Sequence, residues 1–336
     1  MTNMTQARYY LTILLLSCTL SSSAQGAMFS QFYAAPLHTN PALAGSVICG
    51  RFTINYRNQW SMIPGTSSTI SASYDEHFDR LSGALGFIVT NLREGSGAYS
   101  NTTVGAIYSY SFQLTNALSV RTAVQAGFIH RRIDWNNLQF PDQFDLSGFT
   151  GLPTGETPPE TPTGRFLEDF SVGIVGYTDN FFAGFAIHHL STPNEGFMGV
   201  SKLPMKFTAH AGAVFDLRRT RARFRDPNTP TISPNIIFQQ QGAAQQINYG
   251  IYFSDVVPMM VFGLWYRQTI AFNQPESITF LVGIRHNSLR IGYSYDLSIN
   301  GLRGFSGGSH ELSMAYFLSC RTPRAPRIRQ LNCPAF

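Results

Sequence analysis

The sequence has little charge and, beyond its first two dozen residues, no long apolar run. Asp, Glu, Lys and Arg make up 13% of the 336 residues, about half of the share that is usual in soluble proteins. The apolar runs after residue 24 are far shorter than the roughly 20 residues that a transmembrane helix needs, and the mean hydropathy is close to zero. These absences exclude a membrane protein built of helices and disfavour an ordinary soluble protein.

Recognisable motifs for catalysis and cofactor binding are also scarce. The chain has no H-E-x-x-H and no P-loop sequence. His188 and His189 are adjacent, so in a strand they would point to opposite faces and make a poor metal pair. Asp75, Glu76 and His77 combine acid and base groups without a nucleophile. We therefore expect no enzymatic activity, no cofactor and no metal site.

Residues 1–24 are typical of a secretory signal peptide. Arg8 supplies a positive charge, an apolar stretch runs from Tyr9 to about Leu20, and small residues follow up to Ala24. The stretch is too short to span a bilayer and has the flanks of an export signal. We predict cleavage after Ala24 or Gly26, and therefore export.

Four cysteines are present, and cleavage of the signal would remove Cys18. An exported chain meets an oxidising compartment. Cys320 and Cys333 close a short loop near the C-terminus and are a candidate disulfide. Cys49 would then be a free thiol, or it would compete for one of the tail cysteines.

From Arg51 onward, short segments of alternating polar and apolar residues are separated by turn residues. Segments of about ten residues suit tilted strands that cross a bilayer, whereas strands of soluble proteins average five or six residues. Composition alone also fits a secreted β-sandwich. The fourteen predicted strands are approximately 51–59, 67–77, 82–92, 99–112, 117–132, 166–177, 180–190, 205–218, 231–240, 243–253, 257–267, 276–286, 288–297 and 309–318.

The connections between these segments alternate in length, as they do in outer-membrane barrels with short periplasmic turns and long outer loops. Two connections break the rule: 240–242 is tight where a loop is expected, and 219–231 is long where a turn is expected. We predict an all-β fold, a transmembrane antiparallel β-barrel of about 14 strands in the outer membrane. Residues 25–50 form an N-terminal segment, 51–318 the barrel, and 319–336 a basic periplasmic tail.

Charged side chains within the predicted strands can face a wet lumen more easily than lipid. Asp296 and Glu311 are candidates, and their potential partners are Arg121, Arg267, Arg285 and Arg290. Such a network would either close the lumen or shape a pore.

The formal net charge of the chain is +5. A basic surface can indicate nucleic-acid binding, but in an exported barrel we expect an acidic periplasmic partner or anionic cell-wall polymer instead. A basic rim without a partner is the alternative. The basic residues gather at Arg218, Arg219, Arg221, Arg223, Arg225, and in the tail at Arg321, Arg324, Arg327 and Arg329.

The stretch from Phe29 to Ser46, followed by Asn55 to Trp60, resembles the opening of the PorP/SprF family of type IX secretion-associated outer-membrane proteins. That family shows Q-x-Y-x-x-P-x-x-x-N-P-A-x-A-G followed by N-Y-R-x-Q-W, and here the first tyrosine of the pattern falls at Phe32-Tyr33. The matching residues are Gln31, Tyr33, Pro36, Asn40, Pro41, Gly45, Asn55, Arg57, Gln59 and Trp60.

The resemblance implies a barrel of the type IX secretion and gliding system that supports export or surface anchoring of a partner. That partner is an adhesin-like secreted protein with a type-B C-terminal sorting domain. It also implies, for one branch of the family, contact with periplasmic machinery and the cell wall through a lipoprotein. The alternative function is a diffusion pore or transporter for small solutes, which needs an open lumen.

Apolar residues of the N-terminal segment, such as Phe29, Phe32 and Leu43, would hardly stay loose in water. We expect the segment to fold into the lumen or against the periplasmic mouth as a plug, the alternative being a chaperone-recognition segment. On the outer side, loops 133–165 and 191–204 are the natural partner-binding surface. Their large apolar residues are Phe144, Phe149, Phe166, Phe197 and Met198.

Overall fold

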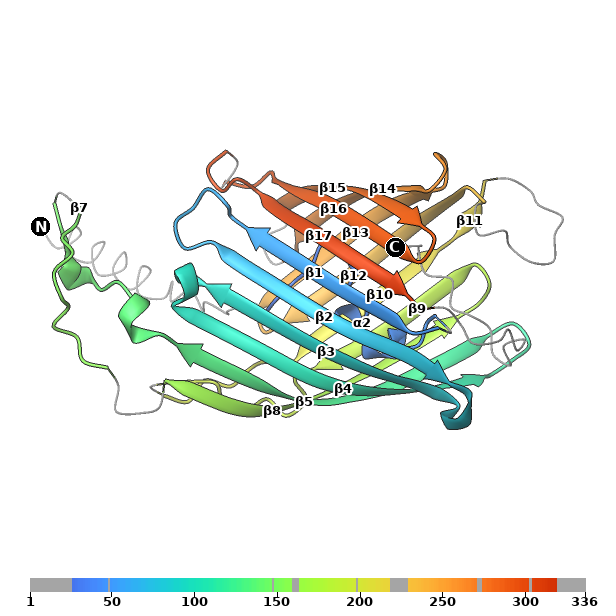
Figure 1. Ribbon diagram of the computed structural model, residues 1–336, viewed down its shortest axis with the longest axis horizontal. Coiled ribbons are helices and arrows are strands. Elements are labelled where there is room, and N and C mark those ends of the chain that lie inside the picture. Colours follow the sequence, from blue (N-terminus) through green and yellow to red (C-terminus); the bar gives the residue numbers. More distant parts are fainter. Residues whose placement is uncertain are drawn as a thin grey trace, which may run out of the picture.

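The computed structural model describes residues 26–47, 49–146, 148–158, 163–197, 199–217, 229–270, 274–301 and 304–318. Fourteen long strands form one closed antiparallel sheet (Figure 1). They are β1 (Arg51–Gln59), β2 (Ser67–Phe78), β3 (Gly83–Glu94), β4 (Tyr99–Gln113), β5 (Ser119–Ile133), β8 (Gly164–Tyr177), β9 (Phe181–His188), β10 (Lys206–Ala213), β12 (Thr231–Gln241), β13 (Ala244–Ser254), β14 (Met260–Thr269), β15 (Gln274–His286), β16 (Leu289–Ser298) and β17 (Ser309–Phe317).

The barrel closes by pairing of the first strand with the last. β1 and β17 run antiparallel in continuous register from Arg51 opposite Phe317 to Gln59 opposite Ser309. Between β10 and β12 the chain forms the two-residue strand β11 (Phe215–Asp216), which pairs with β12 beyond the end of β10. The prediction of an all-β antiparallel barrel of about 14 strands is therefore confirmed.

Most strand ends lie within three residues of the predicted ones, and two boundaries need correction. The predicted strand 205–218 is interrupted, because β10 ends at Ala213 and β11 is separate. The predicted strand 180–190 ends at His188, because the backbone of His189 turns into the left-handed region with φ 61°, where an extended ladder cannot continue.

The barrel wall has its apolar face outside. In β15, Phe280 and Ile284 are 53% and 55% exposed, while Thr279 and Leu281 on either side of Phe280 are buried. In β5, Ser119, Arg121 and Gln125 are buried on the inside, as their alternation with apolar residues predicts. An apolar exterior with a polar interior is the arrangement that a lipid bilayer requires of a barrel.

The two ends of the barrel differ in the length of their connections. At one end the strands are joined by short turns, such as 79–82 and 287–288, and this end faces the periplasm. At the other end lie the longer loops, including residues 134–163, where a small hairpin of β6 (Phe144–Asp145) and β7 (Gly148–Phe149) projects from the barrel (Figure 1). Among the described residues no helix is long and apolar enough to cross a membrane.

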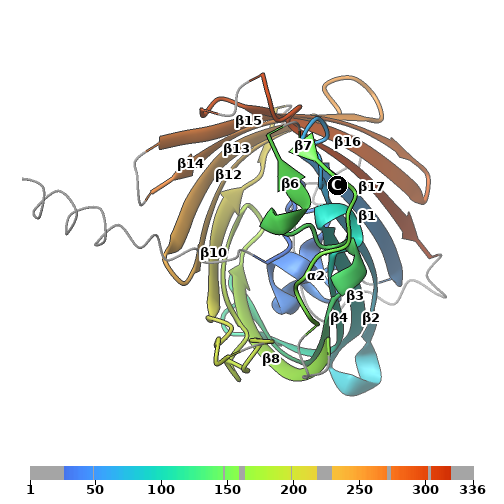
Figure 2. The same cartoon turned by 90° about the vertical axis from the view of Figure 1, so that its left-hand side faces the viewer.

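The N-terminal segment, residues 26–50, occupies the interior of the barrel. Viewed from the loop end, the short helix α2 (Pro36–Thr39) lies inside the ring of strands (Figure 2). The segment starts in the outer half, where the Gly26 amide donates to the Gln241 side chain at the end of β12. It then descends through the turn η1 (Pro41–Leu43) to Gly45, near the periplasmic end.

Candidate functional site: an occupied lumen

Two arginines and two carboxylates form a buried charge cluster inside the barrel: Arg57, Arg267, Asp296 and Glu311. Arg57 of β1 bonds Asp296 of β16 at 2.7 Å and Glu311 of β17 at 3.1 Å. Arg267 of β14 lies 3.7 Å from Asp296. All four residues are at most 4% exposed, and mutual pairing is what makes buried charges tolerable.

The N-terminal segment is bound into this cluster through its backbone. The amides of Ser30 and Gln31 donate to the two oxygens of Glu311, at 2.7 and 3.1 Å. The Ser30 hydroxyl donates to Asp296 at 2.5 Å and accepts from Arg57 and Arg267. Because hydrogen bonds to ionised groups are the strong ones, the cluster fixes the segment to four strands at once.

Gln31 extends this attachment with its side-chain amide. Its Nε2 donates to the Glu311 carbonyl at 3.0 Å and to the Ser294 hydroxyl at 3.2 Å, and its Oε1 accepts from Ser313. The side chain is fully buried. The glutamine that opens the family motif therefore joins the segment to β16 and β17.

Aromatic rings fill the lumen below the charge cluster. The ring of Phe32 lies 5.0 Å from that of Trp265, and Tyr33 lies between Phe182 and Tyr252 at 5.7 and 6.2 Å. The wall rings come from β9, β13 and β14, and all five rings are buried to 97% or more. Their contacts pack the segment as a protein core is packed, at distances typical of aromatic pairs.

The Asn-Pro pair of the motif makes the turn that fits the segment to the wall. Asn40 accepts from the Ala42 amide with Oδ1 and donates with Nδ2 to the carbonyls of Ile174 and Phe185. Pro41 starts η1, as Pro36 starts α2, which suits proline at the first helical position. Gly173 of β8 makes room for Asn40, since a Cβ there would lie 2.1 Å from Oδ1.

Gly45 anchors the lower end of the segment. Its φ is +67°, and a Cβ would lie 2.2 Å from that of Ala84, so only glycine fits. Its amide donates to Asp75, which is also paired with Arg51 at 2.9 Å. The glycine of the motif thus permits a close approach to β3 at the point where the segment turns into β1.

The remaining motif residues lie on or after β1. Asn55 points inward and is 2% exposed, and Gln59 is the last residue of the strand, opposite Ser309. Trp60 follows with φ 61° and donates its amide to the Gly308 carbonyl at 2.8 Å. Of this second half of the motif, Arg57 is the residue that binds the N-terminal segment.

The lumenal charge network was predicted only in part. Asp296, Glu311 and Arg267 do meet inside the barrel. Arg57, which carries the strongest contacts, was identified as a motif residue but not as their partner. Its inward position opposite Glu311 in the β1–β17 register is the signal that could have found it.

The other three candidate arginines lie outside the cluster. Arg121 donates to the Ser111 hydroxyl and to the Ala44 carbonyl of the N-terminal segment. Arg285 pairs with Asp255 near the turn end, and the guanidinium of Arg290 lies 4.1 Å from the centre of the Phe317 ring. Predicting them as partners of Asp296 and Glu311 was wrong, because strand order and register place them elsewhere.

The five apolar residues predicted to contact a partner are dispersed. Phe144 and Phe149 pair across the β6–β7 hairpin, with ring centres 5.5 Å apart, and about half of each is exposed. Phe166 lies on the outer face of β8 and stacks on His130 at 4.3 Å. Phe197 is half-buried in the loop before β10. Met198 lies outside the described residues.

The hairpin loop is held together by an exposed carboxylate. Asp142 accepts from the Gly155 amide at 2.7 Å and from the Thr154 hydroxyl. The Gly155 amide, followed by the Thr154 hydroxyl, lowers the pKa of Asp142. The loop is therefore closed by the ionised form of this side chain.

Cys49 is disulfide-bonded, which removes the free-thiol alternative for it. Its partner lies outside the described residues, as do Cys320 and Cys333, so their pairing stays a prediction. The signal peptide, the basic residues Arg218 to Arg225 and the tail also fall outside the described residues.

One stretch, Gly304-Phe305-Ser306-Gly307-Gly308, matches the G-x-S-x-G pattern of a hydrolase nucleophile. It lies in the loop between β16 and β17, whereas the hydrolase motif requires a turn from a strand into a helix. The Ser306 hydroxyl donates to that of Ser298 at 3.2 Å. The match therefore lacks the structural context of a nucleophile.

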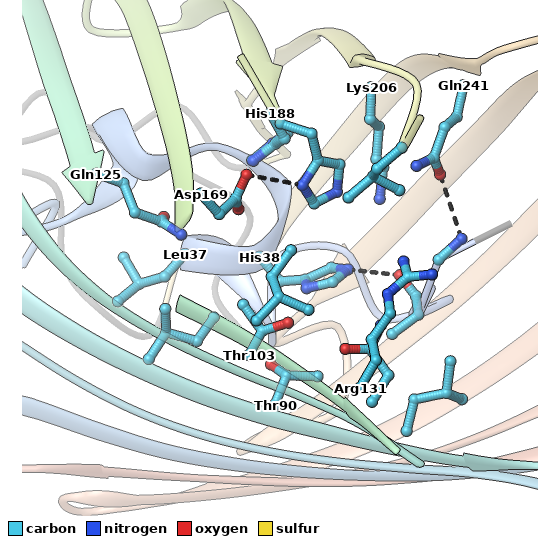
Figure 3. A pocket seen from close by; sticks show the side chains of 18 residues that line it. Leu37, His38, Thr90, Thr103, Gln125, Arg131, Asp169, His188, Lys206 and Gln241 are labelled. Carbon is cyan, nitrogen blue, oxygen red and sulfur yellow. Dashed lines mark hydrogen bonds and ion pairs between the residues drawn. The ribbon is translucent and has the colours of Figure 1, made fainter. Parts of the chain in front are cut away.

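Above the N-terminal segment, on the loop side, lies a cavity that we call the vestibule (Figure 3). Its cavity volume is about 80 Å³, and it is partly open to solvent. The prediction that His188 and His189 point to opposite faces is wrong, because the strand ends between them and both line this cavity. The described residues hold no cluster of three or more His, Cys, Asp or Glu suited to a metal ion.

A closed sheet of fourteen antiparallel strands with an apolar exterior and a filled polar interior defines an outer-membrane β-barrel protein. The model of a family described as "Type IX secretion system membrane protein PorP/SprF" matches residues 21–316. The chain belongs to this family, and the resemblance inferred from its motif is confirmed.

The chain has weak similarity to solved outer-membrane proteins. Omp33 of Acinetobacter baumannii is 9% identical with a TM-score of 0.45, covering 81% of this chain and 99% of its own. A deletion mutant of the monoaromatic hydrocarbon channel TodX is 11% identical with a TM-score of 0.46, covering 84% and 92%. The KdgM porin is 8% identical with a TM-score of 0.34, covering 80% and 99%. No curated protein matches the chain.

Proposed function

We propose that this protein is a non-enzymatic barrel of the type IX secretion and gliding system. It supports the export or surface anchoring of an adhesin-like partner that carries a type-B C-terminal sorting domain. The observation that carries the proposal is the attachment of the N-terminal segment inside the lumen, through Ser30 and Gln31 on Glu311. A lumen filled in this way suits a scaffold for a partner better than a diffusion pore for solutes.

The outer loops are the surface that we assign to the partner. The β6–β7 hairpin presents Phe144 and Phe149 with about half of each side chain exposed, and exposed aromatic residues at an aqueous face favour protein contacts. Phe166 of β8 and Phe197 of the loop before β10 belong to the same end of the barrel. Met198, which follows Phe197 in the sequence, is included in the proposed surface. On the periplasmic side, the basic tail is proposed to meet an acidic secretion component or a lipoprotein linked to the cell wall.

The test is co-purification of the partner with a tagged barrel from detergent-extracted membranes. Replacing Phe144 and Phe149 together by Ser should reduce the recovered partner and its amount on the cell surface at least several-fold. The matched control is Leu114→Ser, because Leu114 is 61% exposed at the periplasmic end. An unchanged recovery with the double variant would contradict the assignment of the hairpin.

The diffusion-pore alternative is tested by conductance in planar bilayers. With the N-terminal segment in place, we expect little ion conductance through the purified barrel. A large and steady conductance of the unmodified protein would favour a pore over a scaffold.

A further inference from the structure

The vestibule has two chemically different walls. One is polar and comes from β5 and β8–β12, with Arg131, Asp169, His188, Lys206 and Gln241 (Figure 3). The other is mixed: it carries the apolar side chains of Ile88, Leu92, Ile129 and Leu203, with Thr90 and Thr103 among them. Small-molecule sites are typically concave and mostly apolar, with a few polar groups that fix the orientation of the ligand.

Lys206 is the polar group without a partner. It is the first residue of β10, is 6% exposed, and extends into the cavity (Figure 3). Within the described residues it makes no hydrogen bond or ion pair. Two carboxylates at this end of the barrel are engaged elsewhere: Asp169 bonds His189 at 3.0 Å, and Glu195 pairs with Arg131.

An ammonium group buried without a counter-charge opposes folding, because it has lost water and gained no partner. The lumen contains a contrasting example in Arg57, whose guanidinium meets two carboxylates. The ammonium of Lys206 has no counter-charge among the described residues, so an anionic ligand would complete the site.

We propose that the vestibule binds an organic carboxylate, with the carboxylate on Lys206 and its apolar chain against Ile88, Leu92 and Ile129. A single negative charge suits the site better than a phosphate, because Asp169 and Glu195 lie in the same region and would repel a dianion. The apolar side chains of the mixed wall select for a hydrocarbon substituent. Free fatty acids and the C-terminal carboxylate of an apolar peptide share this chemistry.

The position of the cavity indicates where the ligand comes from. Some of its lining residues lie at the ends of strands joined by the outer loops, such as Lys206 at the start of β10 and His188 at the end of β9. Its floor is made by Ala27, Leu37 and His38 of the N-terminal segment. A ligand that enters from the cell exterior would thus touch the segment that fills the lumen.

The experiment measures binding to the full protein in phosphatidylcholine nanodiscs by calorimetric titration. The probes are octanoate, octanol, and N-acetyl-trileucine as the free acid and as the amide. We expect at least one of the two acids to bind at least tenfold more tightly than its uncharged counterpart. Preference for octanoate identifies a fatty acid as the source, and preference for the peptide acid identifies a chain end.

Lys206→Met keeps the length of the side chain and removes its charge, so affinity for the preferred acid should fall at least tenfold. Lys202→Met is the matched control, because Lys202 is exposed in the preceding loop and its loss should leave affinity unchanged. A melting temperature of Lys206→Met no lower than that of the parent shows that the fold is intact.

Three results would overturn the proposal: neither acid binds, the uncharged probes bind as tightly as the acids, or Lys206→Met binds as well as the parent. Each of these three results is measured on the purified barrel without any partner protein. Failure of the carboxylate site is therefore distinguishable from failure of the proposed role in export.

Discussion

Two of the buried charge sites in the lumen differ in whether their charges are paired. Against β1 and β14–β17, the charge cluster of Arg57, Arg267, Asp296 and Glu311 is completed by Ser30 and Gln31 of the N-terminal segment. Against β8–β12, Lys206 lies buried without a partner in the described part of the chain. The first group has its ligand within the chain and holds the structure together, while the second lacks one and is free to bind.

The largest effect is expected from removing the carboxylate that binds both Arg57 and the N-terminal segment. Glu311→Gln would leave a buried arginine with one counter-charge fewer and weaken two backbone contacts. Breaking one partner of a buried ion pair costs about 3–5 kcal/mol. The melting temperature in detergent should fall, and residues 26–47 should become accessible to protease.

The control for this variant is Glu156→Gln, because Glu156 is exposed in the outer loop. It should melt as the parent does. If residues 26–47 of Glu311→Gln resisted protease as fully as those of the parent, the charge cluster would not be what holds the N-terminal segment in place.

The second prediction tests the contrast directly, because the same type of substitution should have opposite signs in the two groups. Arg267→Met removes a donor to Asn248 and Ser30 and should destabilise the protein by about 2 kcal/mol. Lys206→Met removes a cation without a partner and should stabilise it by about 1 kcal/mol. Thermal unfolding of the two variants measures the sign of each stability change. A loss of stability in both variants would contradict the difference proposed between Arg267 and Lys206.

The third prediction concerns the fit of the N-terminal segment to the wall. Gly173→Ala would place a Cβ 2.1 Å from Asn40 Oδ1, and such overpacking costs about 1–3 kcal/mol. The control is Gly176→Ala, on the outer face of the same strand. A Cβ at Gly176 would have Leu118 Cδ1 as its nearest atom, 3.9 Å away. We expect protease sensitivity of residues 26–47 in the first variant and none in the second.

The smallest effect is expected in the hairpin loop, far from both charge groups. Because the folded pKa of Asp142 is lowered, its contribution to loop order is present above the unfolded pKa of about 4 and is lost as pH falls below it. Amide exchange at Gly155 should therefore accelerate as the pH approaches 3, after correction for the intrinsic rate. Asp142→Asn should show less protection at neutral pH and little further change with acid.

The strands could be predicted well because each carries its own signal. In β5 and β15 the alternation of polar and apolar residues is local, and the bilayer fixes which face is outside. The errors fell where the backbone departs from regular geometry. His189 ends β9 with a positive φ and has no proline or glycine beside it. β10 stops at Ala213 before β11, and the single glycine there, Gly212, did not mark the break in the alternation.

The interior was harder to predict because its contacts join residues that are far apart in sequence. The hydrogen bond from the Ser30 amide to Glu311 spans 281 positions. The sequence around Glu311 and around Lys206 does not reveal that the first charge has partners in the fold and that the second has none among the described residues. The family motif did identify Gln31, Asn40, Gly45 and Arg57, but it did not reveal what they contact.

The sequence by itself determined a lipid-facing barrel of the outer membrane, because strand alternation is read over a few residues at a time. Tertiary structure alone decided which lumenal charges are paired. Pairing depends on strand order, on register and on the path of the N-terminal segment, and a change of one residue in register would turn an inward carboxylate toward lipid. The filled lumen and the open vestibule are both consequences of that register.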